Sequence, residues 1–322
     1  MSKSKVVFFN GNAQRVADIF CAMAPEGFEI AYASSKLSEE EKIKLLQGVE
    51  YVMLHPGVIS GQILREAKSL KLIQSLTAGY DKIDLKAAKE LNIPVATNGG
   101  ANSWAVAEQS IALLLALYRR LIQCDKSVRE GKWREAISGF NTFEIAGKTV
   151  GIIGAGNIGR KVARRLKAFE ADIIYYDPSV ATDIETELGA RKVSIEELAS
   201  AADIISLHAP LLKDTWGLLG KHEFSLMKPS AVIVNTSRAE LIDQEAFLGA
   251  LQSRRIAGAA LDVFYQEPVL ADDLFLKLDN VIVAPHTAGH TSEGWTRRID
   301  FAWKNIQRVA GGQEPLSAAR KD

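Results

Sequence analysis

Three polar residues that could do chemistry follow apolar runs typical of buried strands: Arg238, Glu267 and His286. Open α/β sheets bind ligands beyond the carboxyl ends of their strands, so an active site is expected at these positions. A histidine can take a hydroxyl proton as a hydride leaves carbon, and a carboxylate against its other ring nitrogen would fix the tautomer. A guanidinium can hold a carboxylate or a carbonyl oxygen through paired hydrogen bonds. Together the three side chains would supply the polar groups that hydride transfer to or from a hydroxyl-bearing carbon requires.

Each of these residues, taken alone, also has a structural interpretation. Arg238 is compatible with a helix cap or a surface arginine, and Glu267 precedes Pro268, as solvated loop residues often do. A single histidine such as His286 is more often structural than catalytic. The chemical interpretation therefore depends on the three side chains meeting in space, which sequence spacing alone does not decide.

Residues 149–166, TVGIIGAGNIGRKVARRL, predict a strand, a tight glycine turn and a helix. The first glycine of the motif allows the sharp turn, the second lets bare backbone approach a pyrophosphate, and the third lets the helix pack closely on its strand. The phosphates are expected on N–H groups at the start of the helix. The predicted cofactor-binding residues here are Gly154, Gly156, Asn157, Ile158 and Gly159.

An acidic residue, Asp177, ends the next predicted strand eighteen residues after Gly159. A carboxylate at this position can accept both ribose hydroxyls of an adenosine. It would repel a 2′-phosphate, and the sequence continues with Pro178, Ser179 and Val180 instead of the arginine usual in NADP sites. The sequence therefore predicts a dinucleotide site that prefers NAD. A purely structural aspartate opening the turn at Pro178 would be compatible with that binding role.

The segments that must position these residues alternate between strands and helices throughout the chain. Strands are predicted in the first hundred residues at 5–10, 28–33, 51–56, 70–76 and 93–98, with helical stretches such as 13–23 and 38–49 between them. Later strands are predicted at 171–177, 203–210, 230–237, 256–264 and 280–286. A long helix is expected from Asn102, as its N-cap, to about Arg129, and a last helix over about 292–310. The fold class is therefore α/β, with two doubly wound parallel-sheet domains.

Composition excludes several classes of partner. The 322 residues suggest two domains, and 39 basic residues balance 39 acidic ones, so nucleic acid and anionic membranes are not expected as partners. Cys21 and Cys124 match no metal or redox spacing, and the predicted site contains no metal. The apolar segment 105–118 is too short to cross a bilayer, and residues 1–10 enter a strand without the apolar region of a signal peptide. A cytoplasmic protein with a small-molecule substrate is expected.

The chain resembles the D-isomer-specific 2-hydroxyacid dehydrogenase family over nearly its whole length. The matching segments occur in the family's order and spacing: 70–84 (LKLIQSLTAGYDKID), Asn102 with 106–108 (VAE), GAGNIG with Asp177, 208–211 (HAPL), 235–238 (NTSR), 262–264 (DVF) with Glu267-Pro268, and Pro285-His286. The resemblance implies a Rossmann NAD-binding domain over 102–290 and a flavodoxin-like substrate-binding domain over 1–101 plus 291–322. It also implies an active-site cleft between them, and a homodimer in which the helix from Asn102 takes part.

The resemblance also implies roles for individual residues. Arg238 would bind the substrate and polarise its carbonyl, His286 would be the general acid/base, and Glu267 its partner. The resemblance also implies that Asp262 contacts the nicotinamide carboxamide and that His208 contributes to the cofactor site. It implies that the backbone N–H groups of Ala78 and Gly79 hold the substrate carboxylate.

Some positions depart from the family's usual pattern. Ala239 stands where a glycine commonly follows the catalytic arginine. If that turn needs backbone angles that only glycine adopts easily, an alanine there would be strained. Gln109 replaces a frequent histidine, and Leu212 a common threonine. The apolar side chains 111, 114, 115 and 118 suit either a dimer interface or burial within the chain.

The substrate is harder to predict than the chemistry. Residues that could line a cleft, or simply pack, are Leu54, His55, Tyr80, Trp104 and Trp295. Glyoxylate or hydroxypyruvate ranks first and 3-phosphoglycerate next, because the chain is short for a phosphoglycerate dehydrogenase with a regulatory domain; phosphite and formate rank lower. The alternative function is an NAD(H)-sensing scaffold, similar to co-repressors of the same fold, that binds the cofactor without turnover.

Overall fold

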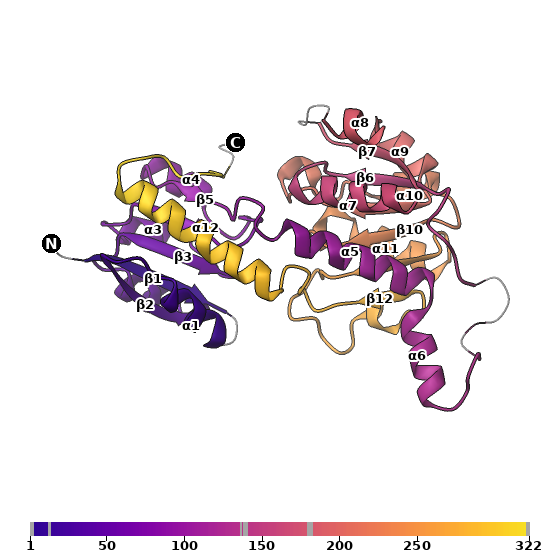
Figure 1. The fold of residues 1–322 in the computed structure, drawn as a ribbon, viewed down its shortest axis with the longest axis horizontal. Helices are drawn as coiled ribbons and strands as arrows, with labels where there is room; N and C mark the ends of the chain where they lie inside the picture. The colour runs from indigo at the N-terminus through magenta and orange to yellow at the C-terminus, as the bar shows by residue number, and fades with distance from the viewer. Residues whose placement is uncertain (1–2, 12–13, 136, 138–140, 179–182, 320–322) are drawn as a thin grey trace. The chain divides into compact units, whose positions relative to one another are not determined.

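The computed structural model describes residues 3–11, 14–135, 137, 141–178 and 183–319. The chain divides into two compact units, one formed by Met1–Asn102 with His290–Asp322 and the other by Ser103–Gly289 (Figure 1). Each unit is built on a parallel sheet. The prediction of two doubly wound α/β domains is confirmed.

The first unit contains a five-stranded parallel sheet in the order β2-β1-β3-β4-β5. Its strands are β1 (Ser4–Asn10), β2 (Phe28–Ser34), β3 (Tyr51–His55), β4 (Leu72–Ser75) and β5 (Val95–Ala96). Its helices are α1 (Gln14–Ala22), α2 (Glu39–Leu45), α3 (Gly61–Glu66), α4 (Leu85–Glu90) and α12 (Ser292–Ala310).

Helices cover both faces of this sheet because its strands carry apolar side chains on both sides. One core cluster contains Phe9, Leu54 and Ile73 from the strands, packed with side chains of α2, α3 and α4. The other contains Phe8 and Met53, packed with α1 and α12. The C-terminal helix therefore belongs to the core of the unit in which the chain begins.

The second unit contains a seven-stranded parallel sheet in the order β12-β11-β10-β9-β6-β7-β8. Its strands are β6 (Thr149–Ile153), β7 (Asp172–Tyr176), β8 (Arg191–Lys192), β9 (Ile204–Leu207), β10 (Val232–Asn235), β11 (Gly258–Leu261) and β12 (Val281–Val283). Strand order reverses at β6, because β7 and β8 lie on one side of it and β9 to β12 on the other. A ligand of such a sheet binds at this switch point, beyond the carboxyl ends of the strands.

Helices also cover both faces of the second sheet. Its helices are α5 (Ser103–Tyr118), α6 (Leu121–Arg129), α7 (Asn157–Ala168), α8 (Asp183–Leu188), α9 (Ile195–Ala201), α10 (Lys221–Leu226) and α11 (Gln244–Gln252), with 3₁₀ turns η1 (Lys213–Thr215), η2 (Ala239–Leu241) and η3 (Leu274–Lys277). One core cluster includes side chains of α5 and α7, and the other includes side chains of α9, α10 and α11. None of the helices in the described parts of the chain is long and apolar enough to span a membrane.

The prediction of one helix from Asn102 to about Arg129 is wrong. The segment forms two helices, because Arg120 adopts a left-handed backbone conformation with φ of +50° between α5 and α6. Neither glycine nor proline marks this position, so the break has no clear local signal. Asn102 precedes α5, and its side-chain oxygen accepts a hydrogen bond from Asn98 Nδ2 at 3.0 Å.

Candidate active site

The glycine turn after β6 has the geometry that its sequence predicts. Gly154 has φ of +89°, and a Cβ there would stand 2.5 Å from the backbone nitrogen of Ala209. A Cβ on Gly159 would overlap the carbonyl oxygen of Gly154. The first glycine therefore serves the turn, and the third serves the close contact between α7 and the turn.

The start of α7 is built to receive an anion. A Cβ on Gly156, the N-cap of α7, would meet no atom within 4 Å, so open space lies in front of this backbone. No side chain caps the helix and its first turn has no acidic residue, so the N–H groups at Asn157 and Ile158 face no competing carboxylate from that turn. The turn thus fits the pyrophosphate of a dinucleotide.

Asp177 lies directly after β7 and is tied to the glycine turn. Its Oδ2 accepts a hydrogen bond from the N–H of Ala155 at 2.9 Å, and the side chain is buried. The carboxylate is therefore held beside the turn. The predicted ribose contact of Asp177 stays a prediction, and Ser179 and Val180, which entered the argument for NAD, lie outside the described residues.

His208 follows β9 and is electrically neutral. Its Nε2 lies 2.8 Å from Ser206 Oγ, while its Nδ1 is closed off from solvent and has no hydrogen-bond partner among the described residues. Burial of the imidazole lowers the pKa of His208 to about 3. Any contact between this ring and a cofactor would consequently be that of an uncharged group.

Three neighbouring parallel strands bring the predicted catalytic residues to one edge of the sheet. β10 pairs with β11, and β11 with β12, all in parallel register. Arg238 follows β10, Glu267 follows β11 and His286 follows β12. Since carboxyl ends of parallel strands meet at the same edge, the three residues share the edge at which the glycine turn also lies.

His286 and Glu267 are in direct contact. His286 Nδ1 lies 2.8 Å from Glu267 Oε2 and 3.0 Å from Oε1. The N–H of Phe264 donates to the same Oε1 at 3.1 Å, which helps to hold the carboxylate in place. Because a carboxylate can only accept, Nδ1 carries the proton, and Nε2 is left as the ring nitrogen that can exchange a proton with another molecule. The His286 side chain is 44% exposed, so the imidazole is open to a ligand.

Asp262 lies at the end of β11 and is completely buried. Its two carboxylate oxygens accept hydrogen bonds from the N–H groups of Thr287, at 3.0 Å, and Ala288, at 2.8 Å. Burial raises the pKa of Asp262, an effect that these two bonds and the charge of His286 oppose. The sequence gives no local signal for this contact, because the partners are 25 and 26 residues apart. The predicted contact of Asp262 with the nicotinamide carboxamide stays a prediction.

The turn that carries Arg238 is held by hydrogen bonds from side chains to backbone carbonyl oxygens. Asn235 Nδ2 donates to the carbonyl oxygen of Arg238 at 2.8 Å, and Arg238 Nη1 donates to the carbonyl oxygen of Ser237 at 2.8 Å. Ala239, whose backbone angles the family pattern brought into question, begins the 3₁₀ turn η2 and is not among the residues of positive φ. An alanine at 239 is therefore free of that strain.

A hydrogen bond that sequence reasoning missed joins α5 to this turn. Ser110 Oγ lies 2.9 Å from Thr236 Oγ1 and also donates to the carbonyl oxygen of Val106 at 2.8 Å. Ser110 and Thr236 are both buried. Two hydroxyl-bearing residues 126 positions apart carry no shared sequence signal.

The segment predicted to bind the substrate carboxylate lies in the first unit, just after β4. Thr77 Oγ1 donates to the carbonyl oxygen of Gly79 at 2.7 Å, and Ser75 Oγ lies 2.7 Å from Thr77 Oγ1. Ala78 is exposed and Gly79 is half-buried. Because both residues closely follow β4, they lie at the carboxyl edge of their own sheet. Their role in binding the substrate carboxylate stays a prediction.

Several residues considered for a cleft have packing roles. His55 and Trp295 are buried together with Arg298, whose Nη1 donates to His55 Nε2 at 3.1 Å. The guanidinium stacks over the Trp295 ring at 4.8 Å, and burial lowers the pKa of Arg298 to about 10. Of the other residues, Leu54 is in the core, Tyr80 is half-buried, and Trp104 is exposed beneath Lys161.

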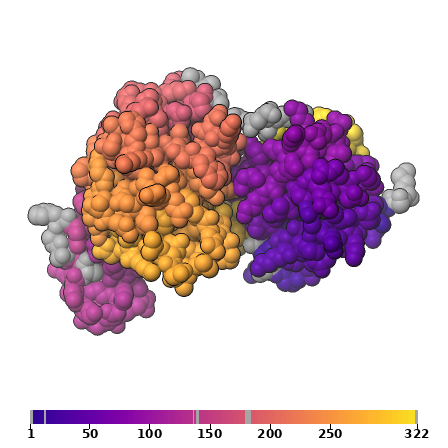
Figure 2. All heavy atoms as spheres, turned by 180° about the vertical axis from the view of Figure 1, so that it is seen from behind, coloured from indigo at the N-terminus to yellow at the C-terminus, as the bar shows by residue number. Residues whose placement is uncertain are grey.

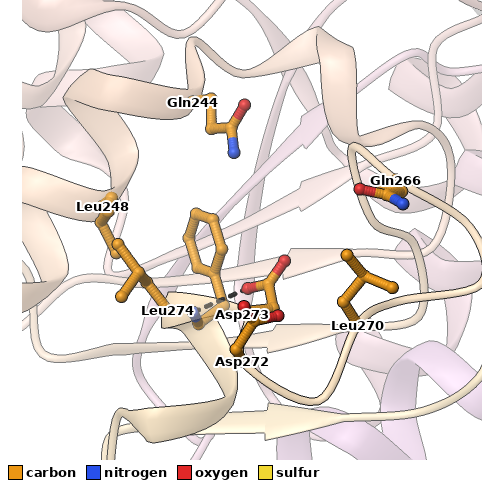
Figure 3. Close-up of a pocket in the computed structure, with 8 residues that line it drawn as sticks. Gln244, Leu248, Gln266, Leu270, Asp272, Asp273 and Leu274 are labelled. Carbon is orange, nitrogen blue, oxygen red and sulfur yellow. Dashed lines mark hydrogen bonds between the residues drawn. The ribbon is translucent and has the colours of Figure 1, made fainter.

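A cavity of about 250 Å³ in the second unit contains none of the predicted site residues (Figure 3). Its lining consists of Gln244, Leu248, Gln266, Leu270, Asp272, Asp273, Leu274 and Phe275. The Asp273 carboxylate, marked by the dashed line in Figure 3, accepts the N–H of Phe275 at 2.8 Å and caps η3. Among the residues that the structure describes, no cluster of three or more His, Cys, Asp or Glu could hold a metal ion.

A dinucleotide turn at the switch point and a histidine–carboxylate pair at the same sheet edge define a nicotinamide-dependent oxidoreductase. Comparison with known proteins agrees. Residues 111–288 match the model of the D-isomer specific 2-hydroxyacid dehydrogenase, NAD binding domain. A glyoxylate reductase of Korarchaeum cryptofilum is 38% identical over 284 residues, which are 88% of this chain and 85% of that protein.

Two further proteins extend the comparison. A D-3-phosphoglycerate dehydrogenase of Archaeoglobus fulgidus is 37% identical over 272 residues, 84% of this chain and 51% of that protein. The structure of an NADPH-dependent glyoxylate/hydroxypyruvate reductase from Sinorhizobium meliloti, in complex with NADP and malonate, superposes with a TM-score of 0.85 at 26% identity, covering both chains completely. The chain belongs to the D-isomer specific 2-hydroxyacid dehydrogenase family, and it is an oxidoreductase that uses a nicotinamide cofactor.

The glycine turn can be tested by adding one methyl group. In Gly159→Ala the new Cβ meets the Gly154 carbonyl oxygen, so the turn must shift, and we expect NADH affinity to fall at least about tenfold. Binding is measured by the fluorescence of the titrated cofactor. Gly249→Ala on α11, where a Cβ meets no atom within 4 Å, is the matched control and should bind NADH as the wild type does. Unchanged binding by Gly159→Ala would mean that this turn is not part of the cofactor site.

Proposed function

We propose that the protein reduces small 2-oxo acids to D-2-hydroxy acids with NADH, and catalyses the reverse oxidation with NAD. The observation that carries the proposal is the contact between His286 Nδ1 and the Glu267 carboxylate at 2.8 Å. It leaves Nε2 of a half-exposed imidazole available at the sheet edge that also holds Arg238 and the glycine turn. This arrangement suits proton exchange with a substrate oxygen.

The proposed roles follow from the chemistry of each group. A bound nicotinamide supplies or accepts the hydride at the substrate's C2. In reduction, His286 Nε2 gives its proton to the carbonyl oxygen as the C2–O bond becomes that of an alcohol; in oxidation it takes that proton back. Glu267 holds the ring and favours the imidazolium that reduction consumes. Arg238 binds the substrate and polarises its carbonyl through paired hydrogen bonds.

Glyoxylate or hydroxypyruvate is the proposed substrate, with 3-phosphoglycerate second. The names of the relatives support this order, because the similar proteins include several glyoxylate reductases that the chain matches over most of their length. The similar proteins also include a phosphoglycerate dehydrogenase, of which the chain spans about half. The backbone N–H groups of Ala78 and Gly79 are proposed to hold the substrate carboxylate.

NAD is proposed as the preferred cofactor on the basis of Asp177, whose buried carboxylate is fixed beside the glycine turn. A negative charge at this position disfavours a 2′-phosphate. The similar reductase from Sinorhizobium meliloti carries NADP, so the family's fold accommodates either form and the choice depends on individual side chains. His208 completes the proposed cofactor contacts, while the carboxamide contact that the resemblance implies for Asp262 stays a prediction.

A homodimer, formed in the cytoplasm, is proposed as the assembled protein, with α6 as part of the interface. The apolar side chains 111, 114, 115 and 118 of α5 pack inside their own unit, so that face of α5 is occupied. By contrast, α6 stands away from the sheet (Figure 1) and projects from the surface of its unit (Figure 2). Leu121, Ile122 and Val128 on this helix are each more than half exposed. Exposed apolar groups on a projecting helix favour a protein partner.

The central experiment is a test of turnover with His286→Ala. Wild-type protein should oxidise NADH with glyoxylate or hydroxypyruvate in an absorbance assay over a panel of 2-oxo acids. Loss of the proton donor should lower kcat about a thousandfold and leave NADH affinity within about threefold. His222→Ala, an exposed histidine on α10, is the control. Tight NADH binding by a wild-type protein that turns over no acid would favour the NAD(H)-sensing scaffold instead.

Arg238→Lys tests the paired hydrogen bonds. Lysine keeps the charge but has no planar fork, so kcat/KM for the 2-oxo acid should fall about a hundredfold. Arg254→Lys, which alters an exposed arginine paired with Asp279, should leave kcat/KM unchanged. A fully active Arg238→Lys enzyme would remove the proposed substrate contact.

Asp177→Ser tests the choice of cofactor. Removing the carboxylate should shift the ratio of kcat/KM for NADPH over NADH upward at least about tenfold, because the repulsion of the 2′-phosphate is lost. The ratio is the informative quantity, since Asp177 also bonds to Ala155 and both cofactors share that turn. Asp172→Ser, at the exposed start of β7, is the control, and an equal ratio in both variants would refute the assignment.

The dimer is tested by placing charges on α6. The double variant Leu121→Glu, Val128→Glu should elute as a monomer in size-exclusion chromatography with light scattering, because burying two carboxylates in an apolar interface is costly. Leu45→Glu, on the surface of α2 in the first unit, should remain dimeric. A dimeric double variant would exclude α6 from the interface.

A further inference from the structure

The backbone at His286 is in a conformation that side chains rarely adopt. Its φ is +54°, in the left-handed region where a Cβ crowds the backbone. The N–H of His286 bends back to the carbonyl oxygen of Ala284 at 3.1 Å, two residues earlier. Such a conformation persists only where the surrounding structure holds it, and it is common at functional sites. The structure must therefore contain contacts that keep this tight turn closed.

Hydrogen bonds hold the turn on both sides of His286. Before it, the N–H of Ala284 donates to the carbonyl oxygen of Leu261 at 2.8 Å, continuing the pairing of β12 with β11. After it, the N–H groups of Thr287 and Ala288 donate to the two oxygens of the Asp262 carboxylate. The strand and the carboxylate thus fix the backbone immediately before and after the histidine.

Asp262 is well suited to this task because it belongs to a rigid element. The residue directly follows Leu261, the last residue of β11, and has no exposed surface. Its N–H donates to the carbonyl oxygen of Asn235 at 2.9 Å, which ties it to the end of β10 as well. A short, buried side chain whose two carboxylate oxygens are both hydrogen-bonded has little freedom to move.

We propose that Asp262 is a positioning residue for His286, holding the left-handed turn so that the imidazole is presented with Nδ1 on Glu267 and Nε2 toward the substrate. The proposal rests on the proposed function, in which His286 exchanges the substrate proton. It differs from the role that family resemblance gives Asp262, a contact with the nicotinamide carboxamide, because it acts through the histidine and not through the cofactor.

The test is Asp262→Asn, which keeps the size of the side chain but turns one acceptor into an NH₂ group facing a backbone N–H. Amide exchange of the peptide containing Thr287 and Ala288, followed by mass spectrometry, should become at least tenfold faster. At saturating NADH and 2-oxo acid, kcat should fall at least tenfold, with the NADH dissociation constant within twofold of the wild type. Asp272→Asn, an exposed carboxylate on the same β11–β12 connection, should change none of these quantities.

A second measurement separates positioning from a general structural role. In the His286→Ala background, single-turnover oxidation of NADH should be no slower with Asp262→Asn than without it, since the group being positioned is gone. A further tenfold loss in that background would overturn the proposal. So would unchanged amide exchange, or weakened NADH binding with kcat at saturation unaltered, which would favour the carboxamide contact.

The amide exchange measurement does not depend on activity. A wild-type protein without turnover would remove the proposed function, while exchange would still report whether Asp262 holds the turn. If Asp262→Asn yields too little folded protein, Asp262→Ser also removes the paired acceptors, and the same exchange and single-turnover measurements apply to it.

Discussion

The parallel pairing of β10, β11 and β12 is the constraint on which the site depends. Because these strands run in the same direction and in register, the residues that follow them emerge at one edge of the sheet. The histidine and the glutamate can then approach to 2.8 Å although 19 positions separate them in the chain. The glycine turn belongs to the same sheet, because it follows β6, which pairs with β9. The proposed catalytic histidine and the proposed cofactor turn thus share one rigid support.

Two acidic residues on the connection after β11 act on the histidine segment in different ways. Glu267 contacts the imidazole itself, and its half-exposed position leaves the pair open to a ligand. The Asp262 carboxylate is buried and accepts hydrogen bonds from the backbone N–H groups of the two residues after His286. Burying a carboxylate is costly unless it is well bonded, which explains why both of its oxygens have donors. One acid can then influence the proton while the other fixes the backbone.

Local sequence signals were most informative where each residue's role is local. Gly154 and Gly159 have separate geometric reasons that are visible in the structure as they are in the motif, and the backbone at Gly156 faces open space. The two sheets and the C-terminal helix could be predicted because strand and helix segments alternate along the chain. The strands appear as apolar runs, since both of their faces are buried. The single helix expected through Arg120 was wrong, because Arg120 adopts a left-handed conformation between α5 and α6 and no glycine at this position predicts the break.

The sequence by itself determined the fold class, the family and the residue types available for chemistry, because periodicity, glycine spacing and charged residues at strand ends are properties of short segments. Only the tertiary structure decided which of them meet. The contact of Glu267 with His286, the bonds of Asp262 to Thr287 and Ala288, and the link from Ser110 to Thr236 all join residues far apart in the chain. Such contacts depend on strand order and register, which no single segment specifies.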